Sequence, residues 1–144
     1  IKPDMGVVCS DGVVGVVLDV SKNYATVLSV LNGRWAINAR HDATRHFGPL
    51  KWDGRDPSFA YLEEIPYHVK INKGDKIVTS GYSSVFPEGV AIGEVEDVEH
   101  LSGDTFQEVK VRLSVDYGGL FYVQVLENVN KEERIELEKL SGNE

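Results

Sequence analysis

The sequence is poor in cysteine. Its 144 residues include one cysteine, Cys9, so no disulfide can form within the chain. We expect Cys9 to be a small buried hydrophobe on an early strand, because a catalytic or redox thiol would need a histidine partner beside it. A lone cysteine leaves the cellular compartment open.

Positive charge is also scarce. Fifteen lysine and arginine residues stand against 23 aspartate and glutamate residues, which gives a net charge of −8. This balance argues against nucleic acid as a partner and disfavours electrostatic binding to anionic lipid. Long apolar runs are missing too, and none approaches the length of a membrane span. Because the sequence begins at Ile1 rather than at a methionine, we expect a fragment or a mature product.

Helical periodicity is nearly absent. Apolar residues instead occur in short valine-rich runs bounded by Gly, Asn, Asp and Pro, which is typical of an all-β protein with antiparallel strands. The clearest run, 106–115, alternates apolar with polar residues, as in a strand with one buried face. We expect strands within residues 7–10, 13–20, 24–31, 35–40, 50–52, 59–62, 67–71, 76–80, 90–98, 106–115 and 120–126. Asn32-Gly33 predicts a hairpin, and 131–140 predicts one or two helical turns in a polar tail.

Glycines divide the central stretch 73–93 into a strand, a loop and a second strand. Gly74-Asp75 predicts a turn, because glycine reaches positive φ freely and aspartate bonds its local backbone. Gly81 ends the first strand, and Gly89 precedes the second. The loop between them, 82–86, carries apolar side chains at its tip, which is unusual for a solvent-exposed segment.

These residues resemble the signature of the MreC family of bacterial rod-shape-determining proteins. The resemblance rests on Gly74-Asp75, on Val78-Thr79-Ser80-Gly81 and on Phe86-Pro87-x-Gly89-Val90-x-Ile92-Gly93. The early runs Gly12-Val13-Val14-Gly15-Val16-Val17 and Val20-Ser21-x-Asn23-Tyr24-Ala25-x-Val27 resemble the opening of the same family. Together the matches cover most of the chain, whereas residues 33–67 match the pattern poorly.

The resemblance implies a non-enzymatic scaffold with two compact β-barrels, located in the periplasm or outside the membrane of a Gram-positive cell. It also implies a preceding coiled coil and membrane anchor that these residues lack. The implied partners are the penicillin-binding transpeptidase of the rod complex, the membrane protein MreD, the glycosyltransferase RodA and further copies of the chain. Binding to them would hold the cell-elongation machinery of peptidoglycan synthesis together and so maintain cell shape. No cofactor is implied.

An internal similarity independently favours two barrels. Gly15-x-Val17-x-x-Val20 and Gly93-x-Val95-x-x-Val98 share one frame, and a glycine within a strand often marks a bulge or a barrel corner. We therefore expect residues 1–68 to form a first barrel subdomain, residues 69–128 a second, and residues 129–144 a polar C-terminal tail. A chance match of so short a motif is the alternative.

A serine hydrolase, active or degenerate, is the sharpest enzymatic alternative. His41 or His46, then Asp53 or Asp56, then Ser80 follow the chain order of a chymotrypsin-like triad on a two-barrel fold. Nothing ahead of Ser80 resembles the glycine-rich turn that aims such a nucleophile, so we expect no catalytic residues. The candidate metal ligands are scattered along the sequence and include no cysteine thiolate, so we expect no metal site. Those side chains are His41, Asp42, His46, His68 and His100.

Aromatic residues leave a third possibility, a cell-wall glycan-binding module. Exposed aromatic rings on a β-scaffold can stack on sugars, although each is more often part of a core or an edge. The candidates are Trp35, Trp52, Tyr82 and Tyr117.

For a protein-binding scaffold, apolar side chains outside the core are the expected contacts. We expect the loop 82–86 and the strand 120–126 to provide them, and open strand edges to add backbone hydrogen bonds. The partner-binding candidates are Tyr82, Val85, Phe86, Phe121 and Tyr122. The alternative for the loop is that it folds back and caps its own barrel.

Overall fold

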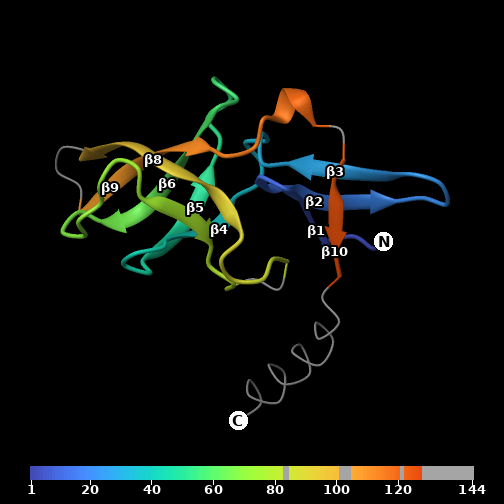
Figure 1. Ribbon diagram of the computed structural model, residues 1–144, viewed down its shortest axis with the longest axis horizontal. Coiled ribbons are helices and arrows are strands. Elements are labelled where there is room, and N and C mark those ends of the chain that lie inside the picture. The colour runs from blue at the N-terminus through green and yellow to red at the C-terminus, as the bar shows by residue number, and fades with distance from the viewer. Residues whose placement is uncertain (83–84, 101–104, 121, 128–144) are drawn as a thin grey trace, which may run out of the picture.

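The protein forms β-strands and one turn of 3-10 helix within the residues that its computed structural model describes, 1–82, 85–100, 105–120 and 122–127 (Figure 1). The all-β class expected from the valine-rich runs is confirmed. The elements are β1 (Gly6–Cys9), β2 (Gly12–Val20), β3 (Ala25–Ser29), β4 (Ile37–His41), β5 (Phe47–Lys51), β6 (Phe59–Pro66), β7 (Lys76–Thr79), β8 (Ala91–His100), β9 (Phe106–Leu113), η1 (Tyr117–Gly119) and β10 (Gln124–Leu126). Within these ranges no helix is long and apolar enough to cross a membrane. Phe121 and the helical turns expected at 131–140 lie outside the described residues.

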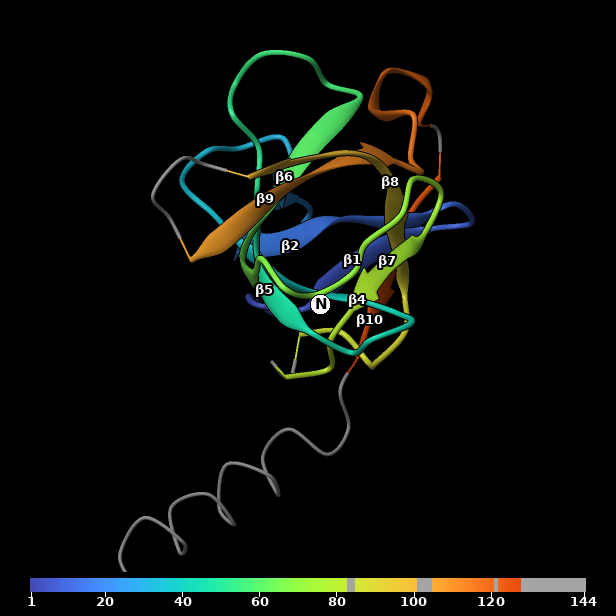
Figure 2. The same cartoon turned by 90° about the vertical axis from the view of Figure 1, so that its left-hand side faces the viewer.

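Six strands close into a barrel in the order β4-β5-β6-β9-β8-β7, each antiparallel to its neighbours. Seen from the barrel side, these strands surround a common interior (Figure 2). The alternation expected along 106–115 is present in β9, where Val109, Val111 and Leu113 are buried and the residues between them are more exposed. Because strand side chains alternate between faces, this pattern fills the barrel interior with apolar groups.

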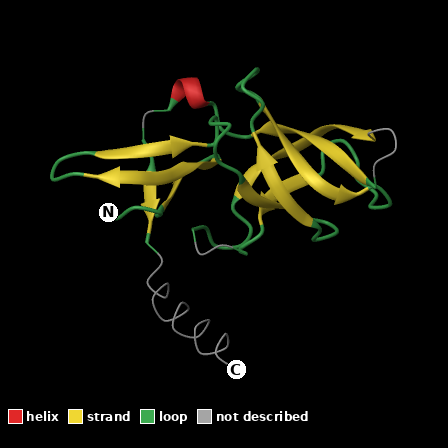
Figure 3. Cartoon of the chain, turned by 180° about the vertical axis from the view of Figure 1, so that it is seen from behind, coloured by secondary structure: helices red, strands yellow, loops and turns green. Residues whose placement is uncertain are grey.

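The remaining strands form an open four-stranded sheet in the order β10-β1-β2-β3. The sheet lies beside the barrel, and η1 lies over the sheet near the junction (Figure 3). One core runs through both parts, because Val8, Val13 and Val30 belong to the same buried cluster as the barrel residues. The hydroxyl of Tyr117 in η1 donates to the carbonyl oxygen of Val13 (2.9 Å), which fastens the segment after β9 to the sheet.

The described strands form one closed barrel and an open sheet, not the two barrels expected. Strands on both sides of the expected boundary after residue 68 share the barrel, because β4 pairs with β7 and β6 pairs with β9. The last strand, β10, returns to pair with β1, so segments from opposite ends of the described chain build one sheet. These pairings join strands far apart in sequence, and a local motif carries little information about them.

Several local expectations also differ from the structure. Asn32-Gly33 does not make a hairpin, because β3 pairs with β2 whereas β4 pairs with β5 and β7, and the segment crosses from sheet to barrel. The strand expected at 67–71 is turn and loop, in which the Val69 N–H donates to the Pro66 carbonyl (3.1 Å). The strand expected at 120–126 is confined to β10.

The shared glycine frame corresponds to a shared local structure. β2 and β8 each contain a register shift just after the first valine of the frame, Val17 and Val95. A Cβ atom on Gly15 would lie 2.2 Å from a carbonyl oxygen of the paired strand, and one on Gly93 would lie 2.1 Å from the equivalent oxygen. The frame therefore marks two bulged strands with close backbone approach, although it does not mark two barrels.

Candidate protein-binding surface

Thr79 closes the central loop between β7 and β8. Its buried Oγ1 donates to the carbonyl oxygen of Pro87 (2.6 Å) and accepts from the N–H of Val90 (2.8 Å). Gly89 has a φ of 88°, where other residues are strained, and its N–H donates to the Thr79 carbonyl (3.0 Å). The threonine and glycine of the central motif thus hold the two ends of the loop together.

Phe86 folds into the core rather than into solvent. Its side chain is 4% exposed and belongs to the cluster shared by sheet and barrel, and Val85 packs partly buried against the same cluster. Gly6 of β1 makes room for them, because a Cβ atom there would lie 2.6 Å from the Val85 carbonyl oxygen and 2.7 Å from Cε1 of Phe86. The expectation that Phe86 is an exposed contact is therefore wrong. Val85 and Phe86 instead agree with the alternative stated above, in which the loop folds back onto its own protein.

Tyr82, by contrast, is exposed and stacks on Phe47 of β5, with the ring centroids 5.6 Å apart. Phe47 is itself 52% exposed, so the two rings form an aromatic pair at the surface. Sequence reasoning misses Phe47, because the strand expected in this part of the chain begins only at residue 50, whereas β5 begins at Phe47. The sequence holds no clear signal for Phe47, because Gly48-Pro49 is typical of a turn, and the outward position of Phe47 beside buried Gly48 is visible only in the structure.

Tyr122 is 90% exposed, and the adjacent Val123 is 46% exposed. Both lead into β10, in which Leu126 pairs with Gly6 of β1. Since Gly6 also lies against Val85 of the central loop, the two candidate segments meet at β1. The structure therefore brings Leu126 at the end of β10 and Val85 of the central loop to the same residue of β1, Gly6, although it does not test whether either segment contacts a partner.

Charged side chains tie the central loop to β4. Arg40 pairs with Glu88 of the loop and, at 3.5 Å, with Asp42. The hydrogen bond from Arg40 holds the pKa of the Glu88 carboxyl below its usual value. Nη1 of Arg45 lies 3.8 Å from the same carboxylate. The surface beside Tyr82 therefore carries two guanidinium groups around one carboxylate.

The Gly74-Asp75 turn is fixed by a buried histidine. Nε2 of His41 donates to Oδ2 of Asp75 (2.7 Å), and its Nδ1 lies 2.8 Å from the hydroxyl of Thr44. The N–H of Asn72 also donates to Oδ2 of Asp75 (2.9 Å). These bonds, from Asn72 first and then from His41, hold the pKa of Asp75 below its ordinary value. Asp75 thus joins the turn before β7 to the end of β4.

The substitution Asp75→Asn should lower the free energy of unfolding by about 1–2 kcal/mol near neutral pH, because an amide accepts weaker hydrogen bonds than a carboxylate. A carboxyl group whose pKa is lowered by folding stabilises the protein above its unfolded pKa, about 3.9, and this contribution is lost as the pH falls through the folded pKa. The difference between parent and variant should therefore shrink below about pH 4.

Urea denaturation at neutral and acidic pH measures this difference, with Asp11→Asn at an exposed turn as the matched control. If the difference at Asp75 stayed constant from about pH 7 to about pH 3, the carboxylate would not be the stabilising group.

The serine-hydrolase order is not assembled in space. The hydroxyl of Ser80 donates to Oδ1 of Asn38 (2.5 Å), while His41 is bound to Asp75 and Thr44 as described above. Asp53 and Asp56 accept backbone N–H groups within their own turns. Each member of the suggested triad therefore has a structural partner outside it.

The histidines are also dispersed. His46 and His68 meet edge to face with ring centroids 6.4 Å apart, and Nε2 of His100 lies 3.1 Å from the side-chain oxygen of Gln107. Over the described ranges, no group of three or more His, Cys, Asp or Glu side chains is arranged to hold a metal ion.

Three of the four aromatic glycan candidates serve the fold. Trp35 packs partly buried against the core, and Nε1 of Trp52 donates to the Asp56 carbonyl (3.0 Å). Tyr117 is bound to the sheet, and burial raises the pKa of its hydroxyl. Tyr82 is the fourth, and its ring is exposed.

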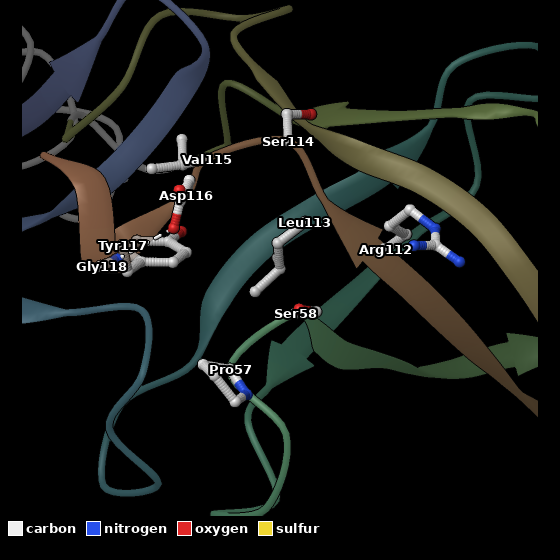
Figure 4. Close-up of a pocket in the computed structure, with 9 residues that line it drawn as sticks. All are labelled: Pro57, Ser58, Arg112, Leu113, Ser114, Val115, Asp116, Tyr117 and Gly118. Carbon is white, nitrogen blue, oxygen red and sulfur yellow. Dashed lines mark hydrogen bonds between the residues drawn. The ribbon is translucent and has the colours of Figure 1, made fainter.

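A hollow of about 340 Å³ lies beside the junction of barrel and sheet (Figure 4). Its charged side chains are already in use: Asp116 accepts from the N–H of Gly118 (3.1 Å), and Arg112 pairs with Glu96 (3.0 Å). The Arg112 side chain also points away from the ring of Tyr117 in Figure 4. We therefore interpret this hollow as a feature of the segment that links β9 to the sheet, and not as a ligand site.

Comparison with known sequences identifies relatives of this chain. The family model described as rod shape-determining protein MreC, barrel core, matches residues 1–127. The cell shape-determining protein MreC of Listeria monocytogenes is 32% identical over 129 residues, which cover 88% of this chain and 44% of that protein. The protein of the same description from Streptococcus pneumoniae is 22% identical over 130 residues, which cover 87% and 47%. The chain thus spans less than half the length of these curated relatives.

Solved structures of MreC share the fold. The structure of MreC from Listeria monocytogenes has a TM-score of 0.81 at 30% identity, covering 89% of this chain and 62% of that one. MreC from Helicobacter pylori, solved in complex with the penicillin-binding protein PBP2, has a TM-score of 0.73 at 20% identity, covering 88% and 78%. The family is described by its role in cell shape and not by an enzymatic activity. Because the family model matches the chain from its first residue through the last strand of its sheet, the chain belongs to the MreC family of rod shape-determining proteins.

Proposed function

We propose that this chain is the extracytoplasmic part of a non-enzymatic scaffold that maintains cell shape by binding a penicillin-binding transpeptidase of the cell-elongation complex. The match of the MreC family model to residues 1–127 carries the proposal. Two relatives of the same fold support its details. One is the Helicobacter pylori MreC solved with PBP2, and the other is a structure described as the major periplasmic domain of MreC, with a TM-score of 0.65.

The contact surface we propose is built on Tyr82 and Tyr122. Both rings are exposed, and their segments approach each other at Gly6 of β1 through Val85 and Leu126. Exposed aromatic rings supply much of the binding energy in protein interfaces when a partner buries them. Phe47 belongs to the same surface through its stacking on Tyr82.

Further partners follow from the resemblance: MreD, RodA and additional copies of the chain. The open edge of β3 supports strand addition, because among the described strands β3 pairs with β2 alone. Such an edge presents backbone donors and acceptors to an incoming strand.

The substitutions Tyr82→Ala and Tyr122→Ala should each raise the Kd for the cognate penicillin-binding transpeptidase at least about tenfold, a loss of about 1.4 kcal/mol. Isothermal titration calorimetry with the extracytoplasmic part of the transpeptidase measures this loss. The matched control is Tyr24→Ala, since Tyr24 is 80% exposed and lies in the turn between β2 and β3. An unchanged Kd in both test variants, or an equal loss in the control, would refute the proposed surface.

A further inference from the structure

A second hollow, of about 320 Å³, lies between the β4–β5 turn and the C-terminal end of β6. Its size is within the range of small-ligand sites. It is lined by Thr44, Arg45, His46, Phe47, Glu64 and Pro66. Two of these residues also belong to the surface beside Tyr82: Phe47 stacks on Tyr82, and Arg45 lies near Glu88.

The backbone of this hollow is strained at two places. Arg45 has a φ of 64° and Glu64 has a φ of 63°, and over the described residues the only other non-glycine residue with positive φ is Asp4. Glycine adopts this conformation without cost, whereas other side chains are disfavoured there. Arg45 ends the β4–β5 turn, and Glu64 lies where the register of β6 shifts. Arg45 and Glu64 are thus charged residues with a backbone conformation that favours glycine, and both residues line the same hollow. Such outliers tend to occur at functional sites.

The two charged groups are also largely unused within the protein. None of the hydrogen bonds or ion pairs among the described residues involves the carboxylate of Glu64. Arg45 is 76% exposed in its side chain, and its nearest charged partner, Glu88, lies 3.8 Å away and is already bound by Arg40. A guanidinium has five N–H donors and a carboxylate can accept several bonds, so both remain available to a ligand. This distinguishes the hollow from the one at the junction, whose charged side chains Asp116 and Arg112 are engaged.

Phe47 adds an apolar surface to the same site. Phe47 lines the hollow, and its ring is stacked on Tyr82 at an interplanar angle of 20°, which restricts the orientation of the ring. An aromatic ring held in this way, with polar groups beside it, suits a ligand that has both an apolar face and hydrogen-bonding edges.

We infer that this hollow binds an uncharged pyranose oligosaccharide. An anion would be attracted by Arg45 and repelled by Glu64, whereas a cation would be repelled by Arg45 and attracted by Glu64. A ligand without net charge avoids both repulsions. Sugar hydroxyls can accept from Arg45 and donate to Glu64 at the same time, and the C–H face of the ring can pack on Phe47. In this inference the sugar ring stacks on Phe47 and not on Trp35 or Trp52, the tryptophans that the sequence suggested for glycan binding.

The inference is tested by titrating the ¹⁵N-labelled protein with chitotetraose and, separately, with cellotetraose. One or both sugars should shift the amide signals of Arg45, His46, Phe47 and Glu64 in a saturable way. Arg45→Gly and Glu64→Gly should weaken this binding at least about tenfold while the Tm stays the same or rises, because glycine relieves the positive φ. Asp4→Gly is the matched control: it relieves the same kind of strain elsewhere and should leave sugar binding unchanged.

Three results would overturn the inference. The first is the absence of saturable shifts with either sugar. The second is unaltered sugar binding in both glycine variants. The third is a zwitterionic Lys-Glu peptide that saturates the same amide shifts at a lower concentration than either sugar, which would assign the hollow to a protein partner. Transpeptidase binding measured with the same glycine variants separates this site from the proposed protein-binding surface.

Discussion

Phe86→Ala is expected to lower the free energy of unfolding by about 3–5 kcal/mol, the usual cost of removing a buried phenylalanine side chain. Phe86 is 4% exposed and lies in the cluster that joins sheet and barrel. The truncation leaves a cavity beside Gly6, and Gly6 has no side chain with which to fill it. Urea denaturation of parent and variant measures the loss.

Tyr122→Ala is the control for this experiment. Its ring is 90% exposed, so the same kind of truncation should change stability by no more than about 0.5 kcal/mol. A loss below about 1 kcal/mol at Phe86 would show that the loop does not pack against β1 as described. The comparison also separates two roles, because weaker partner binding in Phe86→Ala would reflect the damaged fold, whereas in Tyr122→Ala it would reflect a lost contact.

Gly93→Ala is the second substitution with a large expected effect, a loss of about 3 kcal/mol. The new Cβ atom would lie 2.1 Å from the carbonyl oxygen of Arg112 and 2.8 Å from Cγ1 of Val111. Both atoms belong to β9, the paired strand inside the closed barrel, so relief requires the two strands to separate. The melting temperature and the urea midpoint should both fall.

Gly33→Ala is the matched control for Gly93→Ala. A Cβ atom on Gly33 would meet its nearest atom, the carbonyl oxygen of Trp52, at 3.6 Å, an ordinary van der Waals contact. We expect a change within about 0.5 kcal/mol. Equal effects of the two substitutions would mean that the close approach at Gly93 is not what requires glycine there.

Local patterns in the sequence predicted the elements of the fold well where one strand face is buried. The alternation in 106–115 predicted β9 and its buried valines, and the strands expected at 13–20 and 24–31 correspond to β2 and β3. The glycine frame located the bulges of β2 and β8. The resemblance of the central stretch to MreC identified the family, which the match over 1–127 confirms.

The candidate surface could be predicted only in part. The apolar tip of the loop is visible in the sequence, yet the burial of Phe86 depends on the space left by Gly6, which lies about 80 residues earlier in the chain. Phe47 and Glu64 line the same hollow because β5 pairs with β6. Sequence spacing does not express such neighbours, because strand pairing brings distant residues together.

The sequence by itself determined an all-β protein, the positions of most strands, the glycine-dependent bulges and the family. These features depend on alternation and turn chemistry within short segments, which neighbouring residues decide. The tertiary structure alone decided that six strands close into one barrel, that β10 returns to β1, and which aromatic rings remain in solvent. These features follow from how strands distant in the chain pair and share one core, since burial is a property of the assembled fold.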